Sequence, residues 1–345
     1  MTGVLGRWFF VSWLSLMLFS CGRESVNETA PDRGTESVVV YSSIDEARTA
    51  PLYRAFTEET GIRIQQVTGD DDRLLQLMLD KTQAPAADFY ISGSAARLWL
   101  ASDTGVLRPT HADDLSASIP AHLRDPDNEW FSIAVKANVL VFNSTIASAE
   151  EFGSYESLAD AAWHGQLCMS SSALPENNAL IALLIDRHQA NQAELIVRQL
   201  MANLALPVFS DSQALFAAIE SGRCTVGIAS LEATVQRQAA KAGSRLGVAT
   251  PTVANGGMQV DIIGAGVTRH AGNAAAAVRL LRWLAGHKAQ EIIAESLMAL
   301  PAVPAVPAPQ RLRVWQPLQQ SETNVAYLGS LHQEAIDLAE RARYP

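Results

Sequence analysis

Residues 38–67 read VVVYSSIDEARTAPLYRAFTEETGIRIQQV and alternate between a strand pattern and a helix pattern. The β-branched run at 38–41 predicts a first strand. Pro51 suits the first turn of a helix, and apolar residues follow it at helical spacing. Residues 62–67 alternate like a second strand. The series continues with a helix over 72–81, a strand over 88–91 and a helix over 94–101. This order predicts an α/β fold with a mostly parallel sheet covered by helices.

The same alternation extends through the rest of the chain. Strand patterns occupy 139–142, 166–169, 225–228, 247–250 and 259–263, and helix patterns occupy 176–187, 191–204, 213–219, 231–242, 273–285, 287–297 and 331–343. The Pro-, Ala- and Val-rich run over 301–309 predicts a stiff, extended connector. Ligands of open α/β sheets lie beyond the carboxyl ends of the strands, so a cleft between two such units is the expected binding site.

Composition restricts the class of protein. The chain has 345 residues and a formal net charge of -10, which fits two domains or one large one and argues against a general nucleic-acid binder. There is no GxSxG or HExxH motif, and the three cysteines include no CxxC pair. We therefore expect neither an enzyme nor a cofactor.

The amino-terminal residues 1–20 predict a signal peptide. One Arg precedes thirteen uncharged residues, too few to span a membrane. The sequence Leu-Phe-Ser-Cys-Gly at 18–22 resembles a bacterial lipobox, which predicts lipidation at Cys21 and a lipid-anchored tether over 21–37. The alternative is a signal cut elsewhere, with Cys21 incidental. The expected location is the periplasm or the cell surface, at a bacterial membrane.

Two cysteines remain after Cys21, namely Cys168 and Cys224. Thiols tend to oxidise outside the cytoplasm, which favours one disulfide. The alternative is two buried free thiols, and spacing cannot decide between them because a bridge needs Cα atoms within about 7 Å.

Several segments, read in order, resemble the iron(III)-type periplasmic substrate-binding proteins of ABC importers. They include Val38–Ser43, Phe56–Ile62, Arg97–Trp99, His122–Pro126, Leu140–Asn143, Trp163–Gly165, Asp211–Gln213 and Gly264–Val267. The resemblance implies a periplasmic-binding-protein type II fold, with two α/β lobes joined by crossing strands and a ligand cleft between them. It places lobe 1 at 38–138 and 258–304, and lobe 2 at 139–257 and 305–345.

The resemblance also implies a mode of action. The lobes close on a ligand by a hinge motion. The partners are then a small-molecule or ion ligand, an ABC permease, and the membrane through the lipid anchor. We expect a monomer that does not bind nucleic acid.

The chain departs from the family where the family holds ferric iron with adjacent tyrosines. Those places are Ser230 and Leu231, and leucine has no donor atom. Other expected ligand positions fall at Gly93 and Leu300, and the expected arginines at Asn138 and Ser170. Asp45 is the one hard metal ligand that remains. The ligand is therefore expected not to be iron bound by tyrosines, although Fe(III) stays open as an alternative.

Loops at the strand ends supply candidate ligand-binding residues. Hydroxyl and amide groups recognise neutral polar groups, whereas Asp45, Glu232 or Asp261 would pair with a cation. Each serine has an alternative as a turn or helix cap, and Asp261 as a buried hydrogen-bonded carboxylate. The candidates are Ser42, Ser43, Asp45, Ser92, Ser170, Ser171, Asn177, Asn178, Ser230, Glu232 and Asp261.

Three hypotheses follow. The first is a lipid-anchored solute receptor of an ABC importer. The second is a ferric-iron-binding protein that uses Asp45, other carboxylates and a carried chelator. The third is a receptor or scaffold protein that kept the fold and lost ligand delivery.

Overall fold

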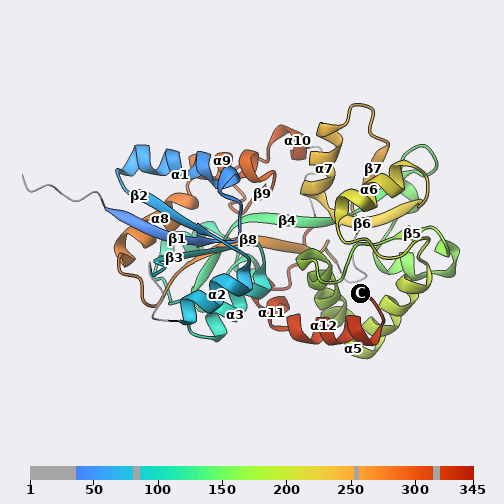
Figure 1. The fold of residues 1–345 in the computed structure, drawn as a ribbon, viewed down its shortest axis with the longest axis horizontal. Coiled ribbons are helices and arrows are strands. Elements are labelled where there is room, and N and C mark those ends of the chain that lie inside the picture. The colour runs from blue at the N-terminus through green and yellow to red at the C-terminus, as the bar shows by residue number, and fades with distance from the viewer. Residues whose placement is uncertain (1–35, 81–85, 252–255, 314–318) are drawn as a thin grey trace, which may run out of the picture. The chain divides into compact units, whose positions relative to one another are not determined.

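The computed structural model describes residues 36–80, 86–251, 256–313 and 319–345 (Figure 1). The predicted signal peptide and Cys21 lie outside these residues, as does almost all of the predicted tether. Within the described part of the chain, no helix is long and apolar enough to cross a membrane.

The first group of strands follows the predicted order. Strand β1 lies between β2 and β3, and both pairs are parallel. Val38 and Val40 point into the core, as do Leu52 and Phe56 of the following helix. Gly61 ends that helix at a φ of 74°, a left-handed conformation that glycine adopts without strain. The elements are β1 (Ser37–Ser42), α1 (Glu46–Thr60), β2 (Arg63–Thr68), α2 (Asp71–Leu79), β3 (Phe89–Ser92) and α3 (Ala95–Asp103).

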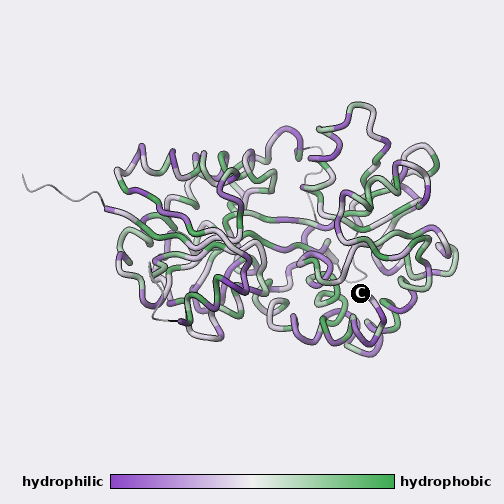
Figure 2. The backbone as a smooth tube through the Cα atoms, in the orientation of Figure 1, coloured by the Kyte–Doolittle hydropathy of each residue, from purple (hydrophilic) through white to green (hydrophobic). Residues whose placement is uncertain are grey.

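A long strand, β4 (Trp130–Asn143), joins this group to a second one. Its residues 130–137 pair with β8 (Val260–Val267), and its residues 138–143 pair with β6 (Val226–Ser230) and β7 (Leu246–Ala249). The sequence predicts only 139–142 as strand, but the expected crossing near Val139 lies where β4 changes partner. Figure 2 shows hydrophobic residues along most of β4, with a hydrophilic stretch near its middle.

The second group is also built of strands and helices. Strand β5 is parallel to β6, and α5 consists of two helical stretches joined at a kink, in agreement with the two helices that the sequence predicts. The break between the predicted helices corresponds to a kink at Gln189, whose φ is 62°. The elements are β5 (Leu167–Cys168), α5 (Pro175–Ala202), α6 (Ser212–Glu220) and α7 (Leu231–Ala240). A disulfide joins Cys168 to Cys224, with Cα atoms 5.8 Å apart.

The prediction of a mostly parallel sheet is wrong. The strand order is β2-β1-β3-β8-β4-β6-β5, with β7 and β9 (Leu300–Pro301) paired to β4. Pairs within each group are parallel, but β4 is antiparallel to every neighbour and β8 is antiparallel to β3. The reason is that the chain leaves the first group along β4 and returns along β8 in the opposite direction.

The carboxyl-terminal helices contact both groups. Helix α11 packs against α3, whereas α12 packs against α5. Gly329 makes the first contact possible, because a Cβ there would lie 2.9 Å from the carbonyl oxygen of Ala95. The remaining elements are α4 (Asp113–Ser118), η1 (Ala121–Leu123), η2 (Ala149–Glu151), η3 (Glu156–Ala159), η4 (Ala161–Trp163), α8 (Ala274–Leu284), α9 (His287–Leu297), α10 (Gln310–Arg313), α11 (Val325–Ser330) and α12 (His332–Arg341).

Candidate functional site

A small polar cavity lies where β4 changes partner from β8 to β6, and we call it the crossing cavity. Its volume is about 40 Å³. Side chains from both crossing strands meet there with the first turns of α5 and α7. The lining residues are Lys136, Ala137, Asn138, Glu176, Ser230, Glu232, Gln259 and Asp261.

Four polar atoms of this lining have no hydrogen-bond partner among the described residues, and we call them unpaired in that sense. They are Oδ1 of Asn138, Oε2 of Glu232, Nε2 of Gln259 and Oδ2 of Asp261, and all four are buried. The large majority of buried polar groups in proteins are paired, because burying an unpaired one costs free energy. Oδ2 of Asp261 has an ion-pair contact with Nζ of Lys136 but no hydrogen bond. Three acceptors and one donor without hydrogen bonds at a single cavity therefore indicate a place for a polar ligand.

Lys136 supplies the positive charge of the crossing cavity. Its Nζ donates a hydrogen bond to the carbonyl oxygen of Gly93 and lies 3.6 Å from Oδ2 of Asp261. Burial alone would lower the pKa of Lys136, but the carboxylates of Asp261, Glu232 and Glu176 outweigh that effect and raise it. The group is therefore an ammonium ion at neutral pH.

Two carboxylates of the crossing cavity, Asp261 and Glu232, differ in how they are held. Asp261 is 3% exposed, and its Oδ1 accepts a hydrogen bond from the backbone nitrogen of Ala95 at 2.9 Å. This bond fixes β8 to the first turn of α3. Burial raises the pKa of Glu232, and the charge of Lys136 opposes that rise only in part. Glu232 is thus a desolvated acid that an added positive charge would stabilise.

The structure brings together only three of the predicted ligand-binding residues at the crossing cavity, namely Ser230, Glu232 and Asp261. Ser230 also caps α7, since its Oγ accepts from the nitrogen of Ala233. Sequence reasoning missed Lys136 and Gln259 as ligand-binding groups. A lysine within a mainly apolar strand, where it is the one charged residue, is the signal that could have found the first of them.

The predicted residues near β1 and β3 form turns and caps, and none of them lines the crossing cavity. Oγ of Ser42 accepts from the nitrogen of Ile44, and Oγ of Ser92 accepts from that of Ser94. Oγ of Ser43 accepts from the nitrogen of Gly93. Asp45 is exposed and caps α1 through the nitrogen of Ala47.

The predicted residues at the start of α5 are largely bonded to one another. Nδ2 of Asn177 donates to Oγ of Ser170 and to the carbonyl oxygens of Ser170 and Ser171. Oγ of Ser171 accepts from the nitrogen of Ala173. Asn178 differs, because its Oδ1 accepts from Nδ1 of His332 at 2.7 Å.

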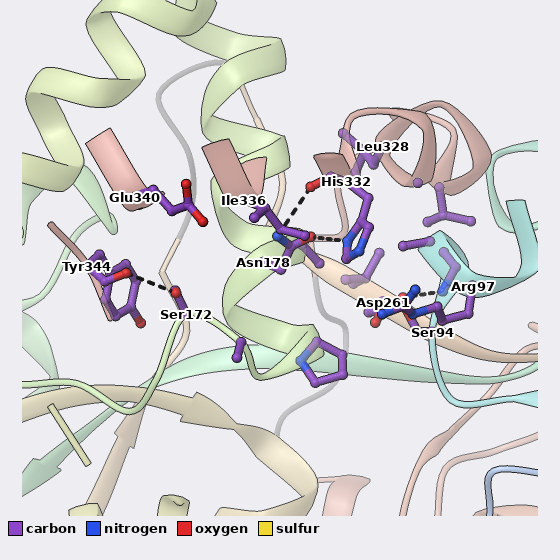
Figure 3. A pocket seen from close by; sticks show the side chains of 18 of the residues that line it. Ser94, Arg97, Ser172, Asn178, Asp261, Leu328, His332, Ile336, Glu340 and Tyr344 are labelled. Atoms are coloured by element: carbon purple, nitrogen blue, oxygen red, sulfur yellow. Dashed lines mark hydrogen bonds between the residues drawn. The ribbon is translucent and has the colours of Figure 1, made fainter. Parts of the chain in front are cut away.

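Asn178 and His332 belong to a second, larger cavity, which we call the helical cavity (Figure 3). Its volume is about 430 Å³, and it lies among the starts of α3 and α5, strand β8 and helices α11 and α12. Asp261 lines this cavity as well as the crossing cavity. The apolar part of the lining includes Ala95, Ala96, Ala173, Pro175, Ala179, Val260, Val325, Leu328 and Ile336.

Tyrosine hydroxyls take no part in the crossing cavity. The chain has six tyrosines, and none of them lines it. Tyr344 lines the helical cavity, but its hydroxyl donates to the carbonyl oxygen of Ser170 and its pKa is raised by burial. Among the residues that the structure describes, no group of three or more His, Cys, Asp or Glu side chains could hold a metal ion.

Comparison with known proteins agrees with the resemblance inferred from sequence. The family model described as bacterial extracellular solute-binding protein matches residues 37–296. Iron uptake protein A1 of Synechocystis is 28% identical over 333 residues, which cover 94% of this chain and 92% of that protein. Iron uptake protein A2 of the same organism is 26% identical, over 98% of this chain and 97% of its own length.

Solved structures show the same fold. The Trichodesmium protein IdiA (FutA), in complex with iron and citrate, is 29% identical with a TM-score of 0.84. The match covers 90% of this chain and all of that one. A Bordetella ferric binding protein is 26% identical with a TM-score of 0.81, over 90% of this chain and 99% of that one. The predicted two-lobe type II fold is thereby confirmed.

Proposed function

The chain belongs to the bacterial extracellular solute-binding proteins, and we propose that it captures a small solute at the crossing cavity and delivers it to the permease of an ABC importer. As a member of this family it is a binding protein and not an enzyme. The observation that carries the proposal is the convergence of four unpaired, buried polar atoms on one cavity between the crossing strands. This polar lining counts against a scaffold that lost ligand delivery.

The position of the cavity supports capture by lobe closure. We assign lobe 1 to 38–138 and 258–304, and lobe 2 to 139–257 and 305–345, with α11 reaching back to α3. The crossing cavity then receives side chains from both lobes. A ligand that bonds to Asp261 and Glu232 together would hold the lobes closed, since these residues lie on β8 and α7.

The charges of the lining favour a cation. Three acids, Glu176, Glu232 and Asp261, face one base, Lys136. Three of the four unpaired atoms are acceptors, so the preferred ligand carries hydrogen-bond donors as well as positive charge. No tyrosine phenolate is among the groups that we propose to bind the ligand.

Ferric iron carried with a chelator is the second candidate. The names of two Synechocystis relatives and the iron and citrate bound by the Trichodesmium protein favour it. In that case Glu232 and Asp261 would be the hard oxygen donors, rather than Asp45, which is exposed and caps α1. Carboxylate oxygens suit a hard cation.

Titration with ferric citrate separates these alternatives. We expect no strong visible absorption band from phenolate-to-iron charge transfer, and a strong band would overturn tyrosine-free binding.

Thermal unfolding with added metals, oxyanions, polyamines and sugars identifies the ligand class, because a ligand one hundredfold above its Kd adds about 2.7 kcal/mol of stability. Metal content after growth in iron-rich medium tests the second candidate directly.

We further propose that the mature chain begins at a lipidated Cys21 and is held at a membrane by that anchor. The lipobox-like sequence at 18–22 supports this proposal. Mass spectrometry of the mature amino terminus tests it. Cys21→Ser should move the protein from the membrane fraction to the soluble exported fraction. An unchanged membrane fraction would show that Cys21 is incidental.

A further inference from the structure

We propose that the solute is an organic cation whose ammonium group occupies the crossing cavity and whose apolar body occupies the helical cavity. This inference rests on the proposed function, and it names the class of solute. Four observations carry it: the sizes of the two cavities, their shared walls, the satisfied polar groups of the larger one, and the balance of charge.

The two cavities differ tenfold in size. The crossing cavity, at about 40 Å³, is close to the volume of one water molecule, about 30 Å³ in the liquid. It has room for an ammonium group, and the rest of an organic solute would extend beyond it. The helical cavity, at about 430 Å³, falls in the range of about 300–1,000 Å³ that is usual for small-molecule sites.

The cavities are neighbours that share walls. On β8, Gln259 lines the crossing cavity, Val260 lines the helical cavity, and Asp261 lines both. On α5, Glu176 lines the first cavity and Pro175 the second. Because the carboxylate of Asp261 belongs to both linings, it can bond to a solute that occupies both cavities. Its Oδ1 accepts a hydrogen bond from the start of α3, and its Oδ2, which has no hydrogen bond, lies 3.6 Å from Nζ of Lys136.

The helical cavity offers a largely apolar wall, and several of its polar groups are already bonded to one another. His332 and Asn178 bond to each other, and Oγ of Ser172 donates to the carbonyl oxygen of Tyr344 (Figure 3). Burial lowers the pKa of His332, so that this side chain is neutral at pH 7. The apolar part of a solute that enters the helical cavity gains free energy because its surface leaves water, and it breaks none of these hydrogen bonds.

The charges complement a cation. Across both linings the acids are Glu176, Glu232, Asp261 and Glu340, and the bases are Arg97 and Lys136. Arg97 already pairs with Asp72, which lines neither cavity, at 2.6 Å. The excess of acid is greatest at the crossing cavity, which is therefore the place for the charged end of the solute.

The test is calorimetric titration of the full-length protein with methylammonium, butylammonium and hexylammonium chlorides. We expect affinity to rise about fourfold for each added methylene, the fold-change that corresponds to about 0.8 kcal/mol per buried CH₂. Asp261→Asn keeps the acceptor for the nitrogen of Ala95 and should weaken all three ions at least tenfold.

A variant that fills the helical cavity tests the placement of the body. Ala173→Phe, at an exposed lining position, should abolish the gain with chain length and leave methylammonium unchanged. The matched control is Ala239→Phe, at an exposed position of α7 outside both linings, which should bind like wild type.

The outcomes distinguish this inference from the proposed function. If all three ions bind with equal affinity, or if Ala173→Phe keeps the gain with chain length, the organic-cation inference is overturned and cation capture at the crossing cavity stands. If no ammonium ion binds while ferric citrate does, the cation is ferric iron and the proposed organic class is wrong. If neither binds, cation capture at the crossing cavity is itself overturned, and the organic-cation inference falls with it.

Discussion

Glu220 and Glu232 lie twelve positions apart on consecutive helices, and the fold treats them in opposite ways. Oε2 of Glu220 accepts from both Arg237 and Lys241 at 2.7 Å, and its Oε1 accepts from Ser244 at 2.9 Å. Although burial would raise the pKa of Glu220, these three bonds lower it to about 2. Oε2 of Glu232 has no hydrogen-bond partner in the described part of the chain, and burial raises the pKa of this residue.

The difference separates a structural acid from a binding acid. A buried carboxylate whose bonds are complete stabilises the fold, and removing it leaves its partners without a counter-charge. A buried carboxylate with an unpaired oxygen costs stability in the empty protein, and a ligand removes that cost on binding. Such an exchange of stability for function is common at binding sites.

The sharpest test of the comparison is Glu220→Gln. We expect a loss of about 2–3 kcal/mol in the free energy of unfolding at pH 7, from the lowered pKa and allowing for the half-exposed Lys241. A lowered pKa stabilises above the ordinary glutamate pKa of 4.5, and that contribution is lost as the pH falls from 4.5 to 2.

Urea unfolding of the wild type and Glu220→Gln at pH 7 and pH 3 measures this effect. The difference between the two proteins should be clearly smaller at pH 3. An equal difference at both pH values would mean that the charge of Glu220 contributes nothing and that only packing was lost.

Glu232→Gln should have the opposite sign. Without ligand, we expect it to gain about 1 kcal/mol at pH 7, because a neutral amide replaces a desolvated acid. A raised pKa makes the folded state hold its proton to higher pH. The wild type therefore loses stability as the pH rises from 4.5 through that raised value, and the variant does not.

Thermal unfolding of both proteins between pH 4 and pH 8 checks this sign, and calorimetry with hexylammonium should show weakened binding by the variant. If Glu232→Gln is destabilising at pH 7, Glu232 is a structural acid like Glu220 and the comparison fails.

The smallest expected effects come from neutral partners of the two clusters. Ser244→Ala removes one bond to Glu220 and should cost about 1 kcal/mol in the free energy of unfolding.

Gln259→Met removes an unpaired Nε2 from the crossing cavity and should leave the stability of the empty protein within about 0.5 kcal/mol of wild type. Paired urea-unfolding curves measure both. Equal losses would show that Gln259 is already bonded in solution.

Local pattern predicted most of the elements but not their pairing. The helices at 273–285 and 287–297 lie close to their predicted places, since amphipathic spacing is a local signal. Helix α1 ends at Gly61 as predicted, but it begins at Glu46, so Pro51 lies inside it and not in its first turn. The antiparallel pairing of β4 with β8 was not predicted. It joins Lys136 to Asp261, which are far apart in the sequence, and no local pattern records such a partner.

The candidate site shows the same division. The chemistry of their side chains predicted that Glu232 and Asp261 could pair with a cation. The family resemblance indicated that the expected tyrosines are absent at positions 230 and 231. Side-chain chemistry also predicted Asp45 and several serines as ligand-binding residues, but in the structure they form helix caps and turns. A side chain's own chemistry is the same in a cap and in a cleft, so sequence cannot separate the two.

By itself, the sequence determined the alternation of strands and helices, the family, the acidic balance and the absence of a tyrosine pair. Only the tertiary structure decided which polar atoms would be left without partners. That outcome depends on β4 and β8 crossing side by side, with Asp261 bonded to Ala95 across 166 positions. Whether a buried polar atom finds a hydrogen-bond partner depends on residues that are distant in the sequence, so local preferences do not determine it.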